Sequence, residues 1–266
     1  MAAATATFTG PQYYDDCLGP LWFEYFAADL VRRLPDQFSG DVLEIACGTG
    51  IVTRKLRERL APSQRLVATD LSPAMLDYAM ARLADCSGIE WREADALALP
   101  FADASFAAVV CGFGFMFAPD RQTALREARR VLVAGGTLLF NVWDRIEDNP
   151  HAETNAAVIE GMFPGDPEMR FRTPYDMHDY AVLRQLLAGA GLHERVMETK
   201  RHPIRGADPR NIAIGQIRGT PRSALIAQRG VSPDLVIDKA SAALAAAGGN
   251  PYTGHAQAVI VEAQAV

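Results

Sequence analysis

The first half of the chain alternates short apolar runs with amphipathic stretches of about 10 to 15 residues, a pattern typical of strands alternating with helices. The runs predict buried strands over residues 41–46, 65–70, 89–93, 106–112 and 137–143. Apolar residues at helical spacing predict helices over 20–34, 49–60, 73–83 and 120–132. This alternation predicts an α/β fold with a Rossmann-like, doubly wound parallel sheet, whose ligand site lies at the carboxyl ends of the strands.

The regular alternation ends after Trp143. Residues 149–180 are rich in Pro, His, Met and Phe, and residues 203–249 contain several helical stretches, the clearest over 233–247. A further helix is predicted over 182–190, and further strands over 193–200 and 256–263. The two irregular segments interrupt the α/β pattern, so we expect them to be insertions that fold against the sheet.

Composition narrows the class of protein. The chain has 266 residues and a formal net charge of -6, which disfavours a nucleic-acid partner because phosphate binding needs a basic face. Its four cysteines form no C-x-x-C pair and no zinc pattern, which suits a reducing cytoplasm. Residues 1–9 do not resemble a signal peptide, and no apolar run reaches the roughly 18 residues of a membrane span. The five histidines show no metal-ligand spacing, so no metal is expected.

The residues that carry chemistry follow three predicted strands in turn. The first strand contains Glu44 and ends in the turn Ala46-Cys47-Gly48-Thr49-Gly50, in which the two glycines allow close approach of the backbone to a ligand. Asp70 ends the second strand, about 20 residues further on, where an acid can accept hydrogen bonds from ribose hydroxyls. Asp95 follows the third strand, where it can accept from an adenine amino group. A nucleoside ligand with a cationic group near Glu44 fits this pattern.

Four motifs resemble those of class I S-adenosylmethionine-dependent methyltransferases, of the type found in ubiquinone and menaquinone biosynthesis. They are Glu-Ile-Ala-Cys-Gly-Thr-Gly, Ala-Thr-Asp-Leu-Ser-Pro-Ala-Met-Leu, Ala-Asp-Ala-Leu-Ala-Leu-Pro-Phe and Ala-Arg-Arg-Val-Leu-Val-Ala-Gly-Gly, in order over about residues 40–143. One departure is Ala46, which stands where the family usually has its first glycine. The alternatives are an NAD-type site, whose G-x-G-x-x-G pattern this turn lacks, and a Rossmann-type fold without a cofactor.

The resemblance implies a seven-stranded sheet with the last strand antiparallel and S-adenosylmethionine as the cofactor. It implies Glu44 near the cofactor's amino group, Asp70 on its ribose, and Leu71 and Met75 around the adenine. Asp95 and Ala96 would meet the edge of the adenine, and the end of the fourth strand at Cys111 would line the methionine moiety. In similar enzymes an N-terminal segment folds over the cofactor, which makes Tyr14 a further contact. The candidate cofactor-binding residues are Tyr14, Glu44, Ala46, Cys47, Gly48, Gly50, Asp70, Leu71, Met75, Asp95, Ala96 and Cys111.

The chain is expected to form a single domain in three parts: an N-terminal helical cap over 1–38, a cofactor-binding core over 39–145, and substrate-side insertions with the last two strands over 146–266. Phe113, Phe115 and Met116 follow the fourth strand and either line an apolar substrate pocket or pack in the core. Tyr175 belongs to the apolar residues of the first insertion. His151 and His178 are candidate general bases, with a surface or structural role as the alternative.

The predicted function is methyl transfer to a small, aromatic or lipophilic acceptor through an oxygen, carbon or nitrogen atom. The sequence after the fourth strand, Cys111-Gly-Phe-Gly, lacks the N/D-P-P-Y motif and argues against an adenine amine as the acceptor. The alternative is a non-catalytic domain that binds the cofactor as a sensor or scaffold. The helical insertions are expected to form an apolar lid that excludes water from the site, and a dimer interface is their alternative role.

Overall fold

The computed structural model describes residues 10–36, 38–170 and 172–266, so residues 1–9 of the predicted cap lie outside the described part. The strands form one seven-stranded sheet in the order β3-β2-β1-β4-β5-β7-β6. Strands β1 to β5 pair in parallel, and β7 runs antiparallel to both of its neighbours. The predicted α/β sheet with an antiparallel last strand is therefore confirmed.

The central strands are nearly continuous apolar runs because helices cover both faces of the sheet. The strand order reverses between β1 and β4, so the switch point lies at the carboxyl end of β1. The strands are β1 Val42–Ile45, β2 Leu66–Asp70, β3 Ile89–Glu93, β4 Phe106–Gly112, β5 Leu132–Trp143, β6 Leu192–Ala207 and β7 Tyr252–Ala265.

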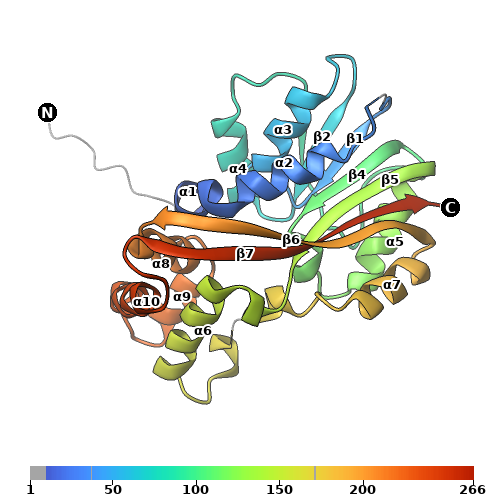
Figure 1. Cartoon of the computed structure of the whole chain (residues 1–266). Coiled ribbons are helices and arrows are strands. Elements are labelled where there is room, and N and C mark those ends of the chain that lie inside the picture. Colours follow the sequence, from blue (N-terminus) through green and yellow to red (C-terminus); the bar gives the residue numbers. More distant parts are fainter. Residues whose placement is uncertain (1–9, 37, 171) are drawn as a thin grey trace, which may run out of the picture.

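Helices pack on both sides of the strands. Figure 1 shows α2, α3 and α4 gathered on one side, with α5 and α7 on the other. The α-helices are α1 Gly10–Leu18, α2 Glu24–Arg32, α3 Ile51–Arg59, α4 Pro73–Arg82, α5 Arg121–Val131, α6 Pro150–Met162, α7 Tyr180–Gly189, α8 Pro209–Arg218, α9 Arg222–Gln228 and α10 Pro233–Gly248. Short helical turns are η1 Gly19–Phe23, η2 Phe115–Phe117, η3 Ile146–Asp148, η4 Pro167–Met169 and η5 Thr173–Tyr175.

The N-terminal helices differ from the single helix expected over 20–34. Helix α1 precedes η1, a π-helical turn with Pro20 near its start, and α2 follows directly. Proline has no backbone N–H, so it cannot donate the regular bond of a continuous helix. The helical periodicity of the sequence was correct, but the helical structure starts earlier and changes its winding at Pro20.

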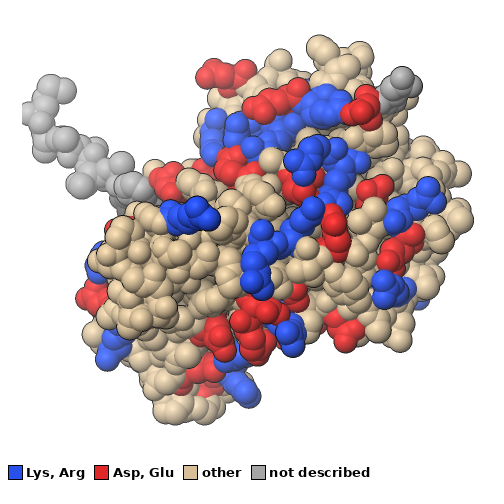
Figure 2. All heavy atoms as spheres, in the orientation of Figure 1, with Lys and Arg blue, Asp and Glu red and all other residues tan. Residues whose placement is uncertain are grey.

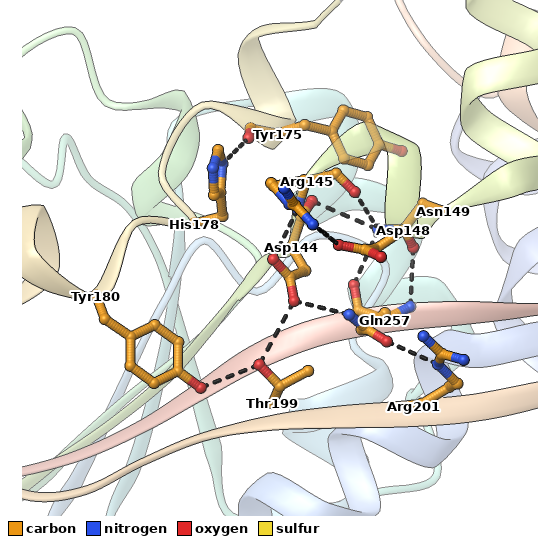
Figure 3. Close-up of polar contacts among 10 residues, drawn as sticks. All are labelled: Asp144, Arg145, Asp148, Asn149, Tyr175, His178, Tyr180, Thr199, Arg201 and Gln257. Carbon is orange, nitrogen blue, oxygen red and sulfur yellow. Dashed lines mark hydrogen bonds and ion pairs between the residues drawn. The ribbon is translucent and has the colours of Figure 1, made fainter.

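The paired strands β6 and β7 extend well beyond the rest of the sheet (Figure 1). Strand β5 pairs with β7 only as far as Trp143 and Ala258, whereas β6 continues to pair with β7 as far as Tyr252. Beyond this point the Asn149 side chain pairs with the edge of β7. Its Nδ2 donates to the Gln257 carbonyl at 3.1 Å, and its Oδ1 accepts from the Gln257 N–H at 2.8 Å (Figure 3). Helices α6, α8, α9 and α10 pack around the end of β6 and β7 that extends beyond β5 (Figure 1).

Candidate active site

A cavity of about 590 Å³ opens at the carboxyl ends of the parallel strands. This volume is within the range of roughly 300–1,000 Å³ that is usual for small-molecule sites. Its lining comes from α1, η1 and α2, from the ends of β1, β2 and β4 with the loops after β1 to β4, from the first turns of α3 and α4, from β5, and from the α8–α9 connection. The lining residues of the loops after β1, β2 and β3 are Ala46–Thr49, Leu71–Ser72 and Ala94–Leu97, and those after β4 are Phe113–Phe115 and Phe117–Pro119.

The glycine-rich turn after β1 is held by Asp70 at the end of β2. One carboxylate oxygen of Asp70 accepts from the Gly48 N–H at 2.8 Å, and the other accepts from the Ser72 N–H at 2.8 Å. A carboxylate offers about four acceptor positions, so Asp70 can still accept two hydrogen bonds from a ligand. Gly48 has φ +55°, and a Cβ built on it meets no atom within 4 Å. Gly48 therefore leaves open space in the lining where any side chain would project.

The other residues of the turn have different surroundings. Ala46 lines the cavity with φ +55°, in the left-handed region that favours glycine. Cys47 lines the cavity too, and burial raises the pKa of its thiol. A Cβ on Gly50 would approach Leu83 of the α4 end to 3.0 Å, so Gly50 permits close packing of the turn against α4. Gly50 is not among the described residues that line the cavity.

Glu44 faces the cavity from β1 and is 1% exposed. Its Oε2 has no hydrogen-bond partner among the described residues. Burial raises the pKa of this carboxyl to about 8, because removal from water disfavours the charged form. A cationic ligand group at Oε2 would restore the charged form and satisfy the oxygen.

The predicted nucleoside side of the site lies at the cavity mouth. Leu71, Met75, Asp95 and Ala96 all line the cavity, as the sequence predicted. Leu71 is 63% exposed and Phe117, from η2, is 56% exposed, so two large apolar side chains flank this part of the lining. Phe117 belongs to the same Phe-rich run as Phe113 and Phe115, which the sequence marks as a candidate pocket wall, although it is not one of the named substrate candidates.

Helix α1 contributes Tyr14 to the lining, and its neighbour Asp15 attaches the helix to the turn. Asp15 is 5% exposed and accepts from Thr49 Oγ1 at 3.1 Å and from Tyr78 Oη at 3.3 Å. It also pairs with Arg82 of α4 at 2.8 Å. Burial raises the pKa of Asp15, and the positive charge of Arg82 opposes that shift. Nothing in the sequence alone distinguished Asp15, because its partners come from two later segments.

An aromatic wall, made of Phe23, Phe113 and Phe115, lines the side of the cavity at the end of β4. Phe113 has φ +57°, and its N–H is held by Asn141 of β5: the Asn141 Oδ1 accepts at 2.9 Å and the Asn141 carbonyl oxygen at 3.2 Å. The predicted residues Phe113 and Phe115 therefore line the cavity. Cys111, Met116 and Tyr175 are buried, but they are not among the described lining residues.

The two candidate bases lie away from the cavity lining. His151 is 1% exposed and stacks on Trp22 at a centroid distance of 4.3 Å. Its Nδ1 contacts Gln216 Nε2 at 2.8 Å, and burial lowers the pKa of His151 to about 3. The Nδ1 of His178 donates to the Tyr175 carbonyl at 2.7 Å (Figure 3). Neither ring is among the described residues that line the cavity, and both have local contacts typical of structural residues.

The two insertions contribute unequally to the lining. Gly219, Thr220 and Pro221, between α8 and α9, belong to the second insertion and line the cavity. The described residues of the first insertion, over 149–180, are not among the lining residues. In the described part of the chain no group of three or more His, Cys, Asp or Glu side chains could hold a metal ion, and no helix is long and apolar enough to cross a membrane.

Known proteins share both the sequence of the core and the fold of the chain. Residues 42–136 match the family model described as a methyltransferase domain. A demethylmenaquinone methyltransferase of Thermus thermophilus is 47% identical over 100 residues, which are 37% of this chain and 44% of that protein. A ubiquinone/menaquinone biosynthesis C-methyltransferase of Xylella fastidiosa is 32% identical over 168 residues, 62% of this chain and 57% of that protein. The matched part thus spans about half the length of these curated relatives.

Solved structures extend the likeness in fold to most of the chain. The YcgJ protein of Bacillus subtilis has a TM-score of 0.62 at 17% identity, covering 91% of this chain and 98% of that one. A geranyl diphosphate methyltransferase in complex with SAM has a TM-score of 0.53 at 16% identity, covering 91% and 85%. At such identities the likeness concerns the fold alone.

The ordered motifs, the matched domain and the sheet topology agree: residues 42–136 match a methyltransferase domain, and they lie in a sheet of the kind that the motifs of class I S-adenosylmethionine-dependent methyltransferases imply. Within this class, its core is similar to the methyltransferases of quinone biosynthesis. The family resemblance inferred from the motifs is therefore confirmed.

Proposed function

We propose that this protein transfers a methyl group from S-adenosylmethionine to a small aromatic or lipophilic acceptor. The observation that carries the proposal is the cavity itself, in which Glu44, the open space at Gly48 and Asp70 lie along one wall. The unpartnered Glu44 Oε2 fits the ammonium group of the methionine moiety. The free acceptor positions of Asp70 fit the two ribose hydroxyls, and the turn leaves room for the nucleoside at Gly48.

Held at Glu44, Gly48 and Asp70, the cofactor would supply an electrophilic methyl group, which an electron pair of the acceptor would take up as the bond to the positively charged sulfur breaks and leaves its electron pair on sulfur. An oxygen or carbon acceptor also loses a proton. The residues of this chain would align the two reactants and exclude water. Tyr14 from α1 and residues 219–221 would cover the reactants, and Phe23 and Phe113 would provide an apolar surface for the acceptor. The names of the quinone-biosynthesis relatives favour a lipophilic acceptor for this chain too.

The proposal excludes a general base at His151 in the arrangement described here, because the lining does not include this ring and its Nδ1 is engaged by Gln216. The same holds for His178 with respect to the lining. An acceptor that ionises readily, such as a phenol or a quinol, needs no strong base. The described lining, which includes neither histidine ring, therefore suits methylation of a phenol or a quinol best.

A cytoplasmic location and the absence of a nucleic-acid partner also belong to this proposal. They are supported by the acidic balance of the sequence and by the four cysteines, which are free in the structure. Figure 2 shows positive and negative side chains interspersed on the face that it displays. Ion pairs among the described residues include Glu24 with Arg54 and with Lys55. Such pairing leaves less free positive charge for a polyanion.

Two measurements test the proposal in sequence. Calorimetry with S-adenosylhomocysteine should show binding at a single site, and no binding would defeat the proposal. A methyl-transfer screen with S-adenosylmethionine should then give turnover with phenols or quinols and less with amines. Tight binding without turnover on any acceptor class would favour the sensor or scaffold.

A further inference from the structure

Asn141 places an unsatisfied hydrogen-bond donor in the cavity. Its side chain is 1% exposed and belongs to the lining, and Nδ2 has no hydrogen-bond partner among the described residues. Leaving a buried polar group without a partner costs about 1–3 kcal/mol. Such a group beside an open cavity indicates that a ligand atom completes the hydrogen bond.

The network around Asn141 determines which of its atoms faces the ligand. Oδ1 accepts from the Phe113 N–H at 2.9 Å, and an amide nitrogen in that place would set a donor against a donor. Nδ2 is therefore the free atom, and it can only donate. The group that completes the site must accept a hydrogen bond, as an oxygen does and as a protonated amine does not.

The position of Asn141 places this donor away from the Glu44 side of the cavity. Glu44 is level with Val110 of β4, and Asn141 is level with Gly112 on the other side of the same strand. With strands about 4.8 Å apart and residues about 3.3 Å apart along a strand, the two Cα atoms are about 12 Å apart. The ammonium nitrogen and reactive methyl of S-adenosylmethionine are five covalent bonds of about 1.5 Å apart, so less than about 7 Å. A methionine moiety held at Glu44 starts on the opposite side of β4 from Asn141, and we therefore assign the neighbourhood of Asn141 to the acceptor.

Aromatic rings pack around Phe113, the residue whose backbone N–H Asn141 binds. Phe113, which Asn141 holds, stacks on Trp143 at a centroid distance of 4.1 Å and meets Phe23 edge-on at 5.4 Å. Phe23 in turn stacks on Tyr14 at 4.8 Å. An apolar wall with one directed donor recognises a flat molecule that has an oxygen on its edge.

We propose that Asn141 determines acceptor specificity by donating from Nδ2 to an oxygen of an aromatic methyl acceptor, such as a phenol, a quinol or a ring ketone. The inference rests on the proposed function, because it assigns the rest of the cavity to the cofactor. It adds a requirement that the family resemblance does not contain: the acceptor has an oxygen that meets β5 beside the aromatic wall.

Asn141→Asp is the sharpest variant. The carboxylate keeps an oxygen for the Phe113 N–H, so it retains the support of the φ +57° turn, but it has lost the donor. Asn155→Asp is the matched control, because Asn155 is also fully buried with one unpartnered side-chain atom but is not among the described lining residues. Thermal unfolding shows that each variant is folded, and Asn141→Ala takes the place of the first if it is not.

The probes are 1-naphthol and naphthalene, which differ only in the oxygen. Equilibrium dialysis at pH 8.5 with saturating S-adenosylhomocysteine should show the wild type binding 1-naphthol about five- to tenfold more tightly than naphthalene, the worth of one net hydrogen bond. The Asn141 variant should lose this preference and bind S-adenosylhomocysteine within about twofold of wild type. The Asn155 variant should keep the preference.

Three results overturn the inference. The wild type could show no preference for 1-naphthol, the Asn141 variant could keep it, or that variant could lose tenfold or more in affinity for S-adenosylhomocysteine, which would assign Asn141 to the cofactor. Failure of the proposed function is distinguishable, because the wild type would then not bind S-adenosylhomocysteine at all.

Discussion

Among the described residues, two regions contain buried polar atoms without hydrogen-bond partners, and they differ in what surrounds those atoms. In the cavity the atoms are Glu44 Oε2 and Asn141 Nδ2, and both residues line open space. Around α6 they include His151 Nε2 and Asn155 Oδ1, on residues that the cavity lining does not include. His151 stacks on Trp22 and lies edge-on to Trp143 at 6.4 Å. An unsatisfied atom therefore indicates a ligand only where a cavity reaches it, and elsewhere it is a cost of packing.

The largest effect should come from filling the open region. In Gly48→Val a branched side chain would project from the turn into the space predicted for the cofactor. We expect affinity for S-adenosylhomocysteine, measured by calorimetry, to fall by more than about a hundredfold, which is more than 2.7 kcal/mol. A folded variant that binds normally would show that this turn is not the cofactor site.

Gly165→Val is the matched control for that variant. Gly165 also has positive φ, +80°, and a Cβ built on it likewise meets nothing within 4 Å, but it lies in the exposed loop after α6. Both substitutions should cost roughly 1–2 kcal/mol of folding free energy, because both force a side chain into the left-handed region. Only Gly48→Val should lose binding.

The next effect concerns Asp70, which is engaged by two backbone N–H groups yet retains acceptor positions for a ligand. Asp70→Ala should lower affinity for S-adenosylhomocysteine by at least about tenfold, since each lost hydrogen bond to a charged group is worth roughly 1.5–3 kcal/mol. Asp70→Asn keeps one acceptor oxygen, so its affinity should lie between those of the wild type and Asp70→Ala. Calorimetry on variants with a wild-type unfolding temperature would measure this order, and equal affinities for all three would remove Asp70 from the site.

Most of the residues that the sequence assigned to the cofactor line the cavity, because their positions are determined locally. Glu44, Gly48 and Asp70 lie at strand ends, where spacing along the chain alone predicts that they meet. Asn141 and Asp15 were overlooked because their partners, Phe113 and Arg82, come from distant segments, and no periodicity encodes such pairs. The prediction for Gly50 named the right motif, but its spacing could not distinguish a glycine facing the ligand from one packed on α4.

In the second half of the chain, after Trp143, the sequence predicted less of the site than in the first half. After Trp143, helices α7 and α10 and strands β6 and β7 were predicted with approximate bounds, whereas α6 was not predicted. The packing of these elements was not predicted either. Residues 219–221 reach the cavity only because α8 and α9 lie within the long β6–β7 connection, which brings them back over α1. His151 resembled a candidate base in sequence, and only its stacking on Trp22 and its contact with Gln216 indicate a structural role.

His151 should make the folding stability of the region around α6 sensitive to acid. Its folded pKa of about 3 lies below the unfolded value of 6.5, so as pH falls below 6.5 the unfolded chain takes up a proton that the folded protein does not. The wild type should lose roughly 1.4 kcal/mol per pH unit from this residue between pH 6 and 4. Urea unfolding across this range should show a shallower loss for His151→Gln, whereas His193→Gln, at an exposed position of β6, serves as control. Equal slopes for wild type and His151→Gln would contradict the assignment.

The smallest effect concerns Ala46, the one position where the turn departs from the glycine usual in the family. Its φ of +55° costs an alanine roughly 1–2 kcal/mol, and a glycine there would lose about 0.5–1 kcal/mol to the freedom of its unfolded chain. Ala46→Gly should therefore raise the free energy of unfolding by about 0.5–1 kcal/mol. Ala104→Gly, at φ +52° in an exposed loop before β4, should gain a similar amount and separates backbone relief from any effect on the cavity.

Because Ala46 lines the cavity, calorimetry with S-adenosylhomocysteine decides what its methyl group does there. Unchanged affinity in Ala46→Gly would mean that the methyl group only strains the turn, and weaker binding would mean that it contacts the ligand and that the strain is retained for binding. No gain in stability at Ala46 beside a gain at Ala104 would show that packing around the turn already compensates for the left-handed backbone.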